Sequence, residues 1–195
     1  AHGNGGHGRW GHDFKMLKDP SGNNTGFERE LKRFSPEQKS AWLDAYTPKN
    51  EAMISQNLEG KELALWKFNR YIKDYLRTIQ SVDDGVGEVL DYLDQEGLTE
   101  NTIVVYTSDQ GFYLGEHGWF DKRFMYEESL RTPILMRYPN EIPEGSIVDK
   151  MIQNLDFAPT FLDYAGIKKP EDMQGASFRN IVNQKGSTWR DAIYY

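Results

Sequence analysis

The sequence predicts an α/β fold, and three observations support this prediction. Apolar residues recur at helical spacing from Lys61 to Leu93, which indicates one helix of about 35 residues. Short apolar runs at 103–107 and 133–137 are typical of strands, and a further helix is predicted over 156–165. A long helix that leads into a buried strand, followed by another strand and another helix, is an α/β element order.

Residues 1–34 are predicted to form a glycine-rich irregular segment, because they are polar and their apolar residues do not recur at helix or strand spacing. Three histidines in this segment lack the i,i+4 spacing of a helical metal site, and we expect them to be idle. They are His2, His7 and His12. The α/β domain is expected to occupy residues 35–195.

A first helix is predicted to begin at Ser35, because a serine N-cap followed by Pro36 is a helix-start pattern. We expect this helix to end near Tyr46, since Pro48 cannot donate the backbone hydrogen bond that continues a helix. The long helix that follows is expected to end at Gly97, a residue type suited to the C′ position.

The two predicted strands differ from half-buried strands in their pattern. Ile103 to Thr107 is apolar without alternation, so we expect it to be buried on both faces. Pro133 to Arg137 is the second strand. The last helix is expected to begin at Asp156 and to end at Gly166, and the residues from Arg190 onward are expected to start a further strand.

Composition limits the classes of function. The net charge of −7 argues against general affinity for nucleic acid, which requires basic surfaces. The chain contains no cysteine, which excludes disulfides, thiolate metal sites and a cysteine nucleophile within these 195 residues. No apolar stretch approaches the roughly 20 residues of a membrane span. A soluble protein that acts on a small anionic substrate remains compatible with this composition.

Asp109 and Gln110 follow the first predicted strand directly. Open α/β sheets bind ligands at the carboxyl ends of their strands. A carboxylate and an amide carbonyl are hard oxygen donors that suit Ca²⁺ or Mg²⁺. The pair therefore predicts part of a metal site, and the alternative is a simple turn that caps the strand.

The next loop carries a histidine and a lysine between glycines. His117 stands in Gly115-Glu116-His117-Gly118, and Lys122 follows shortly after. Taken singly, a loop histidine is more often a hydrogen-bonding residue and a loop lysine a solvated charge. Their closeness to the predicted metal residues favours an anion site. Glu127 and Arg131 are expected to form an ion pair on a short helical turn.

These motifs together resemble the C-terminal half of a type I sulfatase catalytic domain. The resemblance covers roughly residues 61–195, and its blocks occur in the family's order. The blocks are Ser108-Asp109-Gln110-Gly111, Gly115-Glu116-His117-Gly118, Lys122 to Pro133, Leu155-Asp156-Phe157-Ala158-Pro159-Thr160-Phe161-Leu162 and Gln174-Gly175-Ala176-Ser177. It implies an alkaline-phosphatase-like three-layer sandwich, incomplete in this chain.

The resemblance also implies an activity: hydrolysis of sulfate esters, with a sulfated carbohydrate or aryl ester as substrate. Asp109 matches a Ca²⁺-binding aspartate, and Gln110 stands where the family has asparagine or histidine. Lys122 matches the lysine that binds the sulfate group, and His117 falls beside the substrate pocket. We expect export from the cell, because relatives that act on glycans are commonly exported.

The chain lacks the family's nucleophile, a formylglycine made in a Cys/Ser-x-Pro-x-Arg motif. Its only Ser-Pro pair, Ser35-Pro36, leads into a different sequence. We therefore expect the nucleophile upstream, an inactive isolated fragment, and apolar faces that a missing N-terminal part of the domain would cover. Alternatives are a phosphodiesterase or phosphonate monoester hydrolase of the same superfamily, and a non-catalytic binding module.

Overall fold

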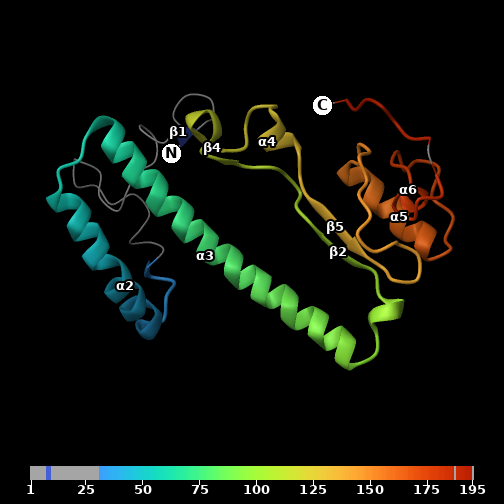
Figure 1. Ribbon diagram of the computed structural model, residues 1–195, viewed down its shortest axis with the longest axis horizontal. Helices are drawn as coiled ribbons and strands as arrows, with labels where there is room; N and C mark the ends of the chain where they lie inside the picture. Colours follow the sequence, from blue (N-terminus) through green and yellow to red (C-terminus); the bar gives the residue numbers. More distant parts are fainter. Residues whose placement is uncertain (1–7, 10–30, 187, 195) are drawn as a thin grey trace. The chain divides into compact units, whose positions relative to one another are not determined.

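The computed structural model describes residues 8–9, 31–186 and 188–194, and Figure 1 shows its elements. The chain divides into two compact units. The first comprises Ala1–Asp83 and Gln110–Arg131, and the second comprises Asp84–Asp109 and Thr132–Tyr195. The prediction for residues 1–34 falls largely outside the described residues, as do all three histidines of that segment. In the described residues, no helix has the length and apolar character that a membrane crossing requires.

Helix α2 (Pro36–Ser55) begins where the sequence predicts. The Ser35 hydroxyl accepts from the Gln38 N–H at 3.2 Å, and the Gln38 side chain accepts from the Ser35 N–H at 2.9 Å. This reciprocal capping box satisfies two backbone donors at the helix start.

The predicted end of α2 near Tyr46 is wrong, because the helix continues through Pro48. Side chains on both sides of the proline contact the next helix along the chain. Tyr46 donates to Asp74 at 3.2 Å, and Arg70 donates to Asn50 at 3.3 Å. These contacts offset the hydrogen bond that the proline cannot make.

Helix α3 (Gly60–Gln95) is the long helix that the sequence predicts, and its residues belong to both units. The N–H of Leu98 donates to the carbonyl of Leu93 at 2.9 Å, and Gly97 has a φ of +65°. This is a Schellman end, so the predicted role of Gly97 as C′ residue is confirmed. No residue of α3 is buried.

The first unit contains a small antiparallel sheet that the sequence does not predict, with strand order β1–β4–β3. Its strands are β1 (Gly8–Arg9), β3 (Tyr113–Leu114) and β4 (Trp119–Asp121). A 3₁₀ turn, η2 (Glu116–Gly118), joins β3 to β4, and helix α4 (Glu127–Leu130) follows β4.

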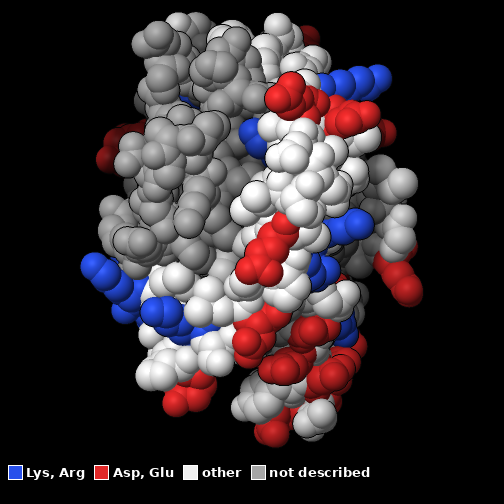
Figure 2. Space-filling model, turned by 90° about the vertical axis from the view of Figure 1, so that its left-hand side faces the viewer, with Lys and Arg blue, Asp and Glu red and all other residues white. Residues whose placement is uncertain are grey.

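The space-filling view shows acidic and basic side chains interspersed on the face that it presents (Figure 2).

The second unit contains β2 (Val104–Thr107) and β5 (Ile134–Arg137), which pair antiparallel with Val104 opposite Arg137. Both predicted strands are confirmed, but the expected burial of residues 103–107 on both faces is wrong. Tyr106 is 40% exposed and Leu135 is 65% exposed. Two strands give each other too little neighbouring surface to bury both faces of the pair.

The core of the second unit is formed by Phe178, Ile181 and Val182, against which partly buried side chains pack. Helix α6 (Arg179–Val182) contributes two of these core residues, and Phe157 of helix α5 (Phe157–Tyr164) packs against them. Two 3₁₀ turns, η1 (Thr99–Asn101) and η3 (Asn154–Asp156), also belong to this unit. Residues 188–194 form no strand, so the expected strand after Arg190 is wrong for these described residues.

Helix α5 ends at Gly166 as predicted, but Asp156 is not the side-chain cap that its position suggests. Its fully buried carboxylate accepts from the N–H groups of Gln153 and Ala176, at 2.8 Å and 2.9 Å, and from Arg190. The carboxylate therefore caps the start of η3 instead of α5, and it also connects this segment to Ala176 and Arg190.

Candidate functional site

An aromatic cluster shapes the loop that carries the predicted anion-binding residues. Tyr113 is fully buried, and its hydroxyl donates to the carbonyl of Phe124 at 2.8 Å. The ring of Trp119 lies 4.9 Å from that of Phe124 and 5.8 Å from that of Tyr126. These ring contacts hold the loop in a compact form. Phe124 and Tyr126 nevertheless stay 44% and 49% exposed.

His117 lies within this aromatic loop. Its φ of +57° is in the left-handed region, which residues with a side chain seldom adopt. The imidazole stacks on Tyr126 with ring centroids 5.0 Å apart, and Nε2 lies 3.2 Å from Oε1 of Glu128. The side chain remains 44% exposed. The histidine is therefore oriented by neighbours and still accessible to a ligand.

Lys122 follows β4 and has an exposed side chain. Its ammonium makes no hydrogen bond or ion pair with any residue that the structure describes. The carboxylate of the preceding residue, Asp121, forms its ion pair with Arg123 instead, and it accepts from Arg123 Nε at 3.1 Å. The main chain at Lys122 is fixed, since its carbonyl accepts from the Ser129 hydroxyl at 2.7 Å. A cation on a fixed backbone suits the binding of an anion.

Asp109 and Gln110, the predicted metal residues, fall at the boundary between the two units. Asp109 is exposed, and its main-chain carbonyl accepts from Asn154 Nδ2 at 2.9 Å. Gln110 is half-buried. In the described part of the chain, no three histidine or carboxylate side chains gather as a metal site would require. Two oxygen donors fit Ca²⁺ in kind, but Ca²⁺ takes about six to eight, so these two residues would supply only a share of the ligands.

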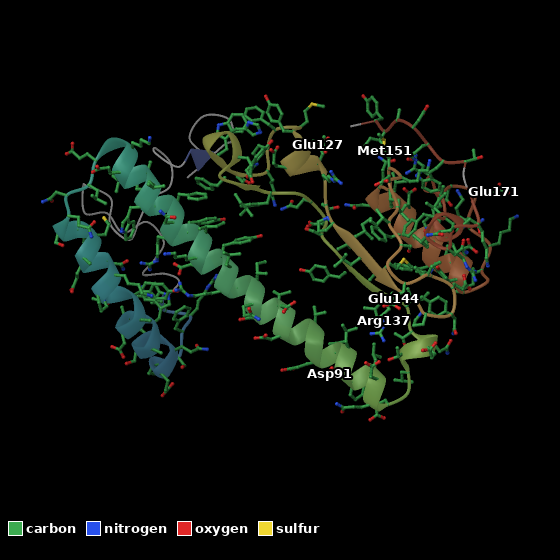
Figure 3. All side chains as sticks on the ribbon, in the orientation of Figure 1. Asp91, Glu127, Arg137, Glu144, Met151 and Glu171 are labelled. Atoms are coloured by element: carbon green, nitrogen blue, oxygen red, sulfur yellow. The ribbon has the colours of Figure 1, made fainter. Side chains whose placement is uncertain are left out.

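The predicted helical turn before Arg131 is confirmed as α4, and Figure 3 labels Glu127 at its start. The expected ion pair between Glu127 and Arg131 is wrong. Arg131 is the C-cap in extended conformation, with ψ of 119°, so its side chain leaves the helix face. A backbone bond of 2.8 Å joins the two residues instead. The sequence reasoning missed Glu128 and Ser129, and only their position between Lys122 and the second strand could have drawn attention to them.

Several known proteins are similar to this chain in sequence or structure. The family model described as "N-sulphoglucosamine sulphohydrolase, C-terminal" matches residues 115–195. An N-acetylglucosamine-6-O-sulfatase of Bacteroides thetaiotaomicron is 47% identical over 184 residues, which are 93% of this chain and 32% of that protein. An extracellular sulfatase homolog of Drosophila melanogaster is 39% identical over 60% of this chain and 10% of its own length.

The chain is similar to a C-terminal portion of a sulfatase domain. A solved structure of a protein in complex with its substrate D-glucosamine-2-N,6-O-disulfate has a TM-score of 0.83 and 43% identity, over 94% of this chain and 39% of that one. A phosphonate monoester hydrolase from Silicibacter pomeroyi has a TM-score of 0.60 at 24% identity, over 84% and 29%, and shows the shared fold. The chain thus has part of an alkaline-phosphatase-like α/β fold, and it spans about a third of the length of the N-acetylglucosamine-6-O-sulfatase that it resembles.

Proposed function

We propose that the protein is a sulfuric ester hydrolase that removes sulfate from a sulfated carbohydrate. Lys122 carries this proposal, because its ammonium is exposed and unpaired among the described residues while its main chain is held by Ser129. The sequence similarity to an N-acetylglucosamine-6-O-sulfatase supports the choice of reaction. The 195 residues alone are expected to be inactive.

Lys122 and His117 are proposed to act on the substrate directly. Hydrolysis of a sulfate ester builds negative charge on the oxygens of the transferred group and on the bridging oxygen. A fixed ammonium close to these oxygens stabilises that charge more than it stabilises the substrate, and this difference accelerates the reaction. His117, oriented by Glu128, would contact the substrate beside the sulfate group.

Asp109 and Gln110 are proposed as ligands of Ca²⁺, with Mg²⁺ as an alternative. When bound, the ion would add electrostatic stabilisation of the anionic group. The remaining ligands and the formylglycine nucleophile are proposed to come from a part of the protein outside these 195 residues, since no Cys/Ser-x-Pro-x-Arg motif occurs within them.

A sulfated amino sugar is the proposed substrate class. Phe124 and Tyr126 expose aromatic rings in the loop that carries Lys122, and such rings can pack against the apolar face of a sugar. A similar structure contains D-glucosamine-2-N,6-O-disulfate, which supports the same class. We also propose that the protein is exported, because its relatives include extracellular sulfatases.

The full-length protein is expected to release inorganic sulfate from glucosamine 6-O-sulfate. Ion chromatography of the reaction would measure the release, with a sulfated chromogenic aryl ester as a second substrate. Cleavage of a phosphonate monoester without release of sulfate would contradict the proposal and favour the phosphonate hydrolase alternative. Tight binding of the sulfated sugar by the isolated 195 residues would instead favour a binding module.

The N-terminal part of the same domain is the proposed partner of these residues. Helix α3 exposes several large apolar side chains, each 40% to 58% accessible: Leu65, Leu76, Ile79, Val82 and Val89. Apolar surface of this extent normally marks an interface. Its position along an amphipathic helix indicates a protein surface that packs by helix–sheet or helix–helix contact.

Without that partner, the isolated 195-residue chain is expected to self-associate through these apolar side chains, and replacing Leu76 by glutamate is expected to reduce this association. Leu76 is 56% exposed, so the new charge costs little in folding but interrupts the apolar stripe. Sedimentation velocity would measure the oligomer fraction. Ser81→Glu is the matched control, because Ser81 is an exposed polar residue of the same helix and the substitution adds the same charge. Equal behaviour of the two variants would contradict the prediction.

A further inference from the structure

We propose that α4 is the positioning element of the anion-binding loop, with Ser129 and Glu128 as its positioning residues. In this short helix, Ser129 contacts the main chain at Lys122, and Glu128 contacts the side chain of His117. The inference rests on the proposed function, since it gives Ser129 and Glu128 roles in the same reaction. All of these residues lie in the first unit.

Ser129 links two segments of the loop through two hydrogen bonds. It is only 8% exposed, and its hydroxyl donates to the Lys122 carbonyl at 2.7 Å. Its own carbonyl accepts from the Gly111 N–H at 3.0 Å. A buried hydroxyl with a short bond restricts the peptide that it holds. The base of the Lys122 side chain is therefore fixed although its tip is exposed.

Glu128 acts on the histidine instead of on the lysine. Its Oε1 lies 3.2 Å from Nε2 of His117, and its side chain is 29% exposed. A carboxylate acceptor at Nε2 fixes the ring orientation and the nitrogen that carries the hydrogen. His117 needs such support, because its backbone has the unfavourable φ of +57°.

The position of α4 depends on a close approach to Gly111. A Cβ atom at this glycine would lie 2.2 Å from the carbonyl oxygen of Glu128 and 2.8 Å from that of Ser129. Only glycine lets the two main chains approach so closely. Since Gly111 directly follows Gln110, α4 is packed against the chain at one proposed metal ligand while it holds the segments of Lys122 and His117.

A double-mutant cycle in the full-length protein separates positioning from a general structural role. Ser129→Ala is expected to lower kcat/KM for glucosamine 6-O-sulfate about tenfold, because the lysine loses its fixed base. In a Lys122→Ala background the same change should cost less than about twofold, since no ammonium remains to be positioned. Ser55→Ala is the matched control, because the exposed Ser55 hydroxyl also donates to a backbone carbonyl, that of Ala52 at 2.9 Å.

Glu128 provides a second test that does not disturb a buried residue. Glu128→Ala is expected to lower kcat/KM about tenfold, and Glu128→Gln, which keeps an oxygen acceptor for Nε2, at most about threefold. Equal costs of Ser129→Ala in both backgrounds, or full activity of Ser129→Ala and Glu128→Ala, would overturn the inference while leaving the proposed function intact. Absence of any sulfate release by the wild-type protein would instead reject the proposed function, and this inference with it.

Discussion

Replacing Arg190 by alanine is expected to lower the free energy of unfolding by about 3 kcal/mol, because it leaves a buried carboxylate without its cation. Asp156 is fully buried, and Arg190 is 22% exposed. The guanidinium contacts both carboxylate oxygens, with Nη2 donating to Oδ1 at 2.8 Å and Nη1 to Oδ2. Removing one partner of a buried ion pair is strongly destabilising, because the other charge stays buried without compensation. Replacing both partners by apolar residues of similar volume changes the stability much less.

The pair matters because it connects the last described residues to the core of the second unit. Trp189, next to Arg190, donates from Nε1 to the carbonyl of Met151 at 2.8 Å and packs against the core cluster. Loss of the ion pair should therefore loosen the segment around Trp189. Urea unfolding followed by tryptophan fluorescence would measure the change in stability and report on this segment.

Arg137→Ala is the matched control for this prediction. Arg137 donates to Asp94 at 3.2 Å in the same unit, but the two side chains are 41% and 57% exposed. Solvent screens an exposed pair of this kind, so its removal is expected to change stability very little. Similar losses from Arg190→Ala and Arg137→Ala would contradict the prediction.

The same ion pair makes stability depend on pH in a defined direction. Burial raises the pKa of Asp156, but hydrogen bonds from Arg190 and from the N–H groups of Ala176 and Gln153 outweigh it and leave the pKa below its ordinary value. The folded state thus binds the proton more weakly than the unfolded state does. The stabilisation is present above the unfolded pKa of about 3.9 and is lost as pH falls through the folded pKa. Arg190→Ala should reduce this acid sensitivity.

Local sequence patterns predicted most helices and strands correctly. The predictions were wrong where contacts between residues distant in the sequence determine the structure. Helix α3 and its end at Gly97 follow from apolar periodicity and one glycine, both of which act within a few residues. The continuation of α2 through Pro48 depends on Arg70 and Asp74, which belong to another helix. The residues close to Pro48 in the sequence do not include these partners, so a local pattern cannot predict the contacts.

In the candidate site, too, some residues could be predicted from local motifs and others could not. Lys122 and His117 could be singled out because the spacing of motifs around them is that of a family. Glu128 and Ser129 could not, because the predicted helical turn does not specify their contacts with residues 11 and 7 positions earlier in the chain. Asp156 is similar, since its position predicts a helix cap while its cation lies 34 residues further along the chain.

Replacing Lys122 by alanine is expected to lower kcat/KM of the full-length protein about 10²- to 10³-fold, the usual loss when one preorganised charge-stabilising group is removed. The side chain is exposed, and its ammonium is bound by none of the described residues, so the substitution should leave folding unchanged. Steady-state release of sulfate from glucosamine 6-O-sulfate would measure the loss. Lys73→Ala, at an exposed lysine of α3 in the same unit, removes an equal charge and should leave the activity unaltered.

Lys122→Arg distinguishes the location of the charge from its mere presence. Arginine keeps the positive charge but replaces a compact ammonium with a planar fork on a different stem. If Lys122 acts as a point charge held at one place by the Ser129 bond, the arginine variant should recover only part of the activity. Full recovery would mean that any nearby cation suffices, and full activity of Lys122→Ala would remove the lysine from the reaction. Two results together would support the inference: partial recovery of kcat/KM in Lys122→Arg, and no further loss when Ser129→Ala is added to Lys122→Ala. They would show that the reaction requires the Lys122 side chain to be held by its fixed main chain.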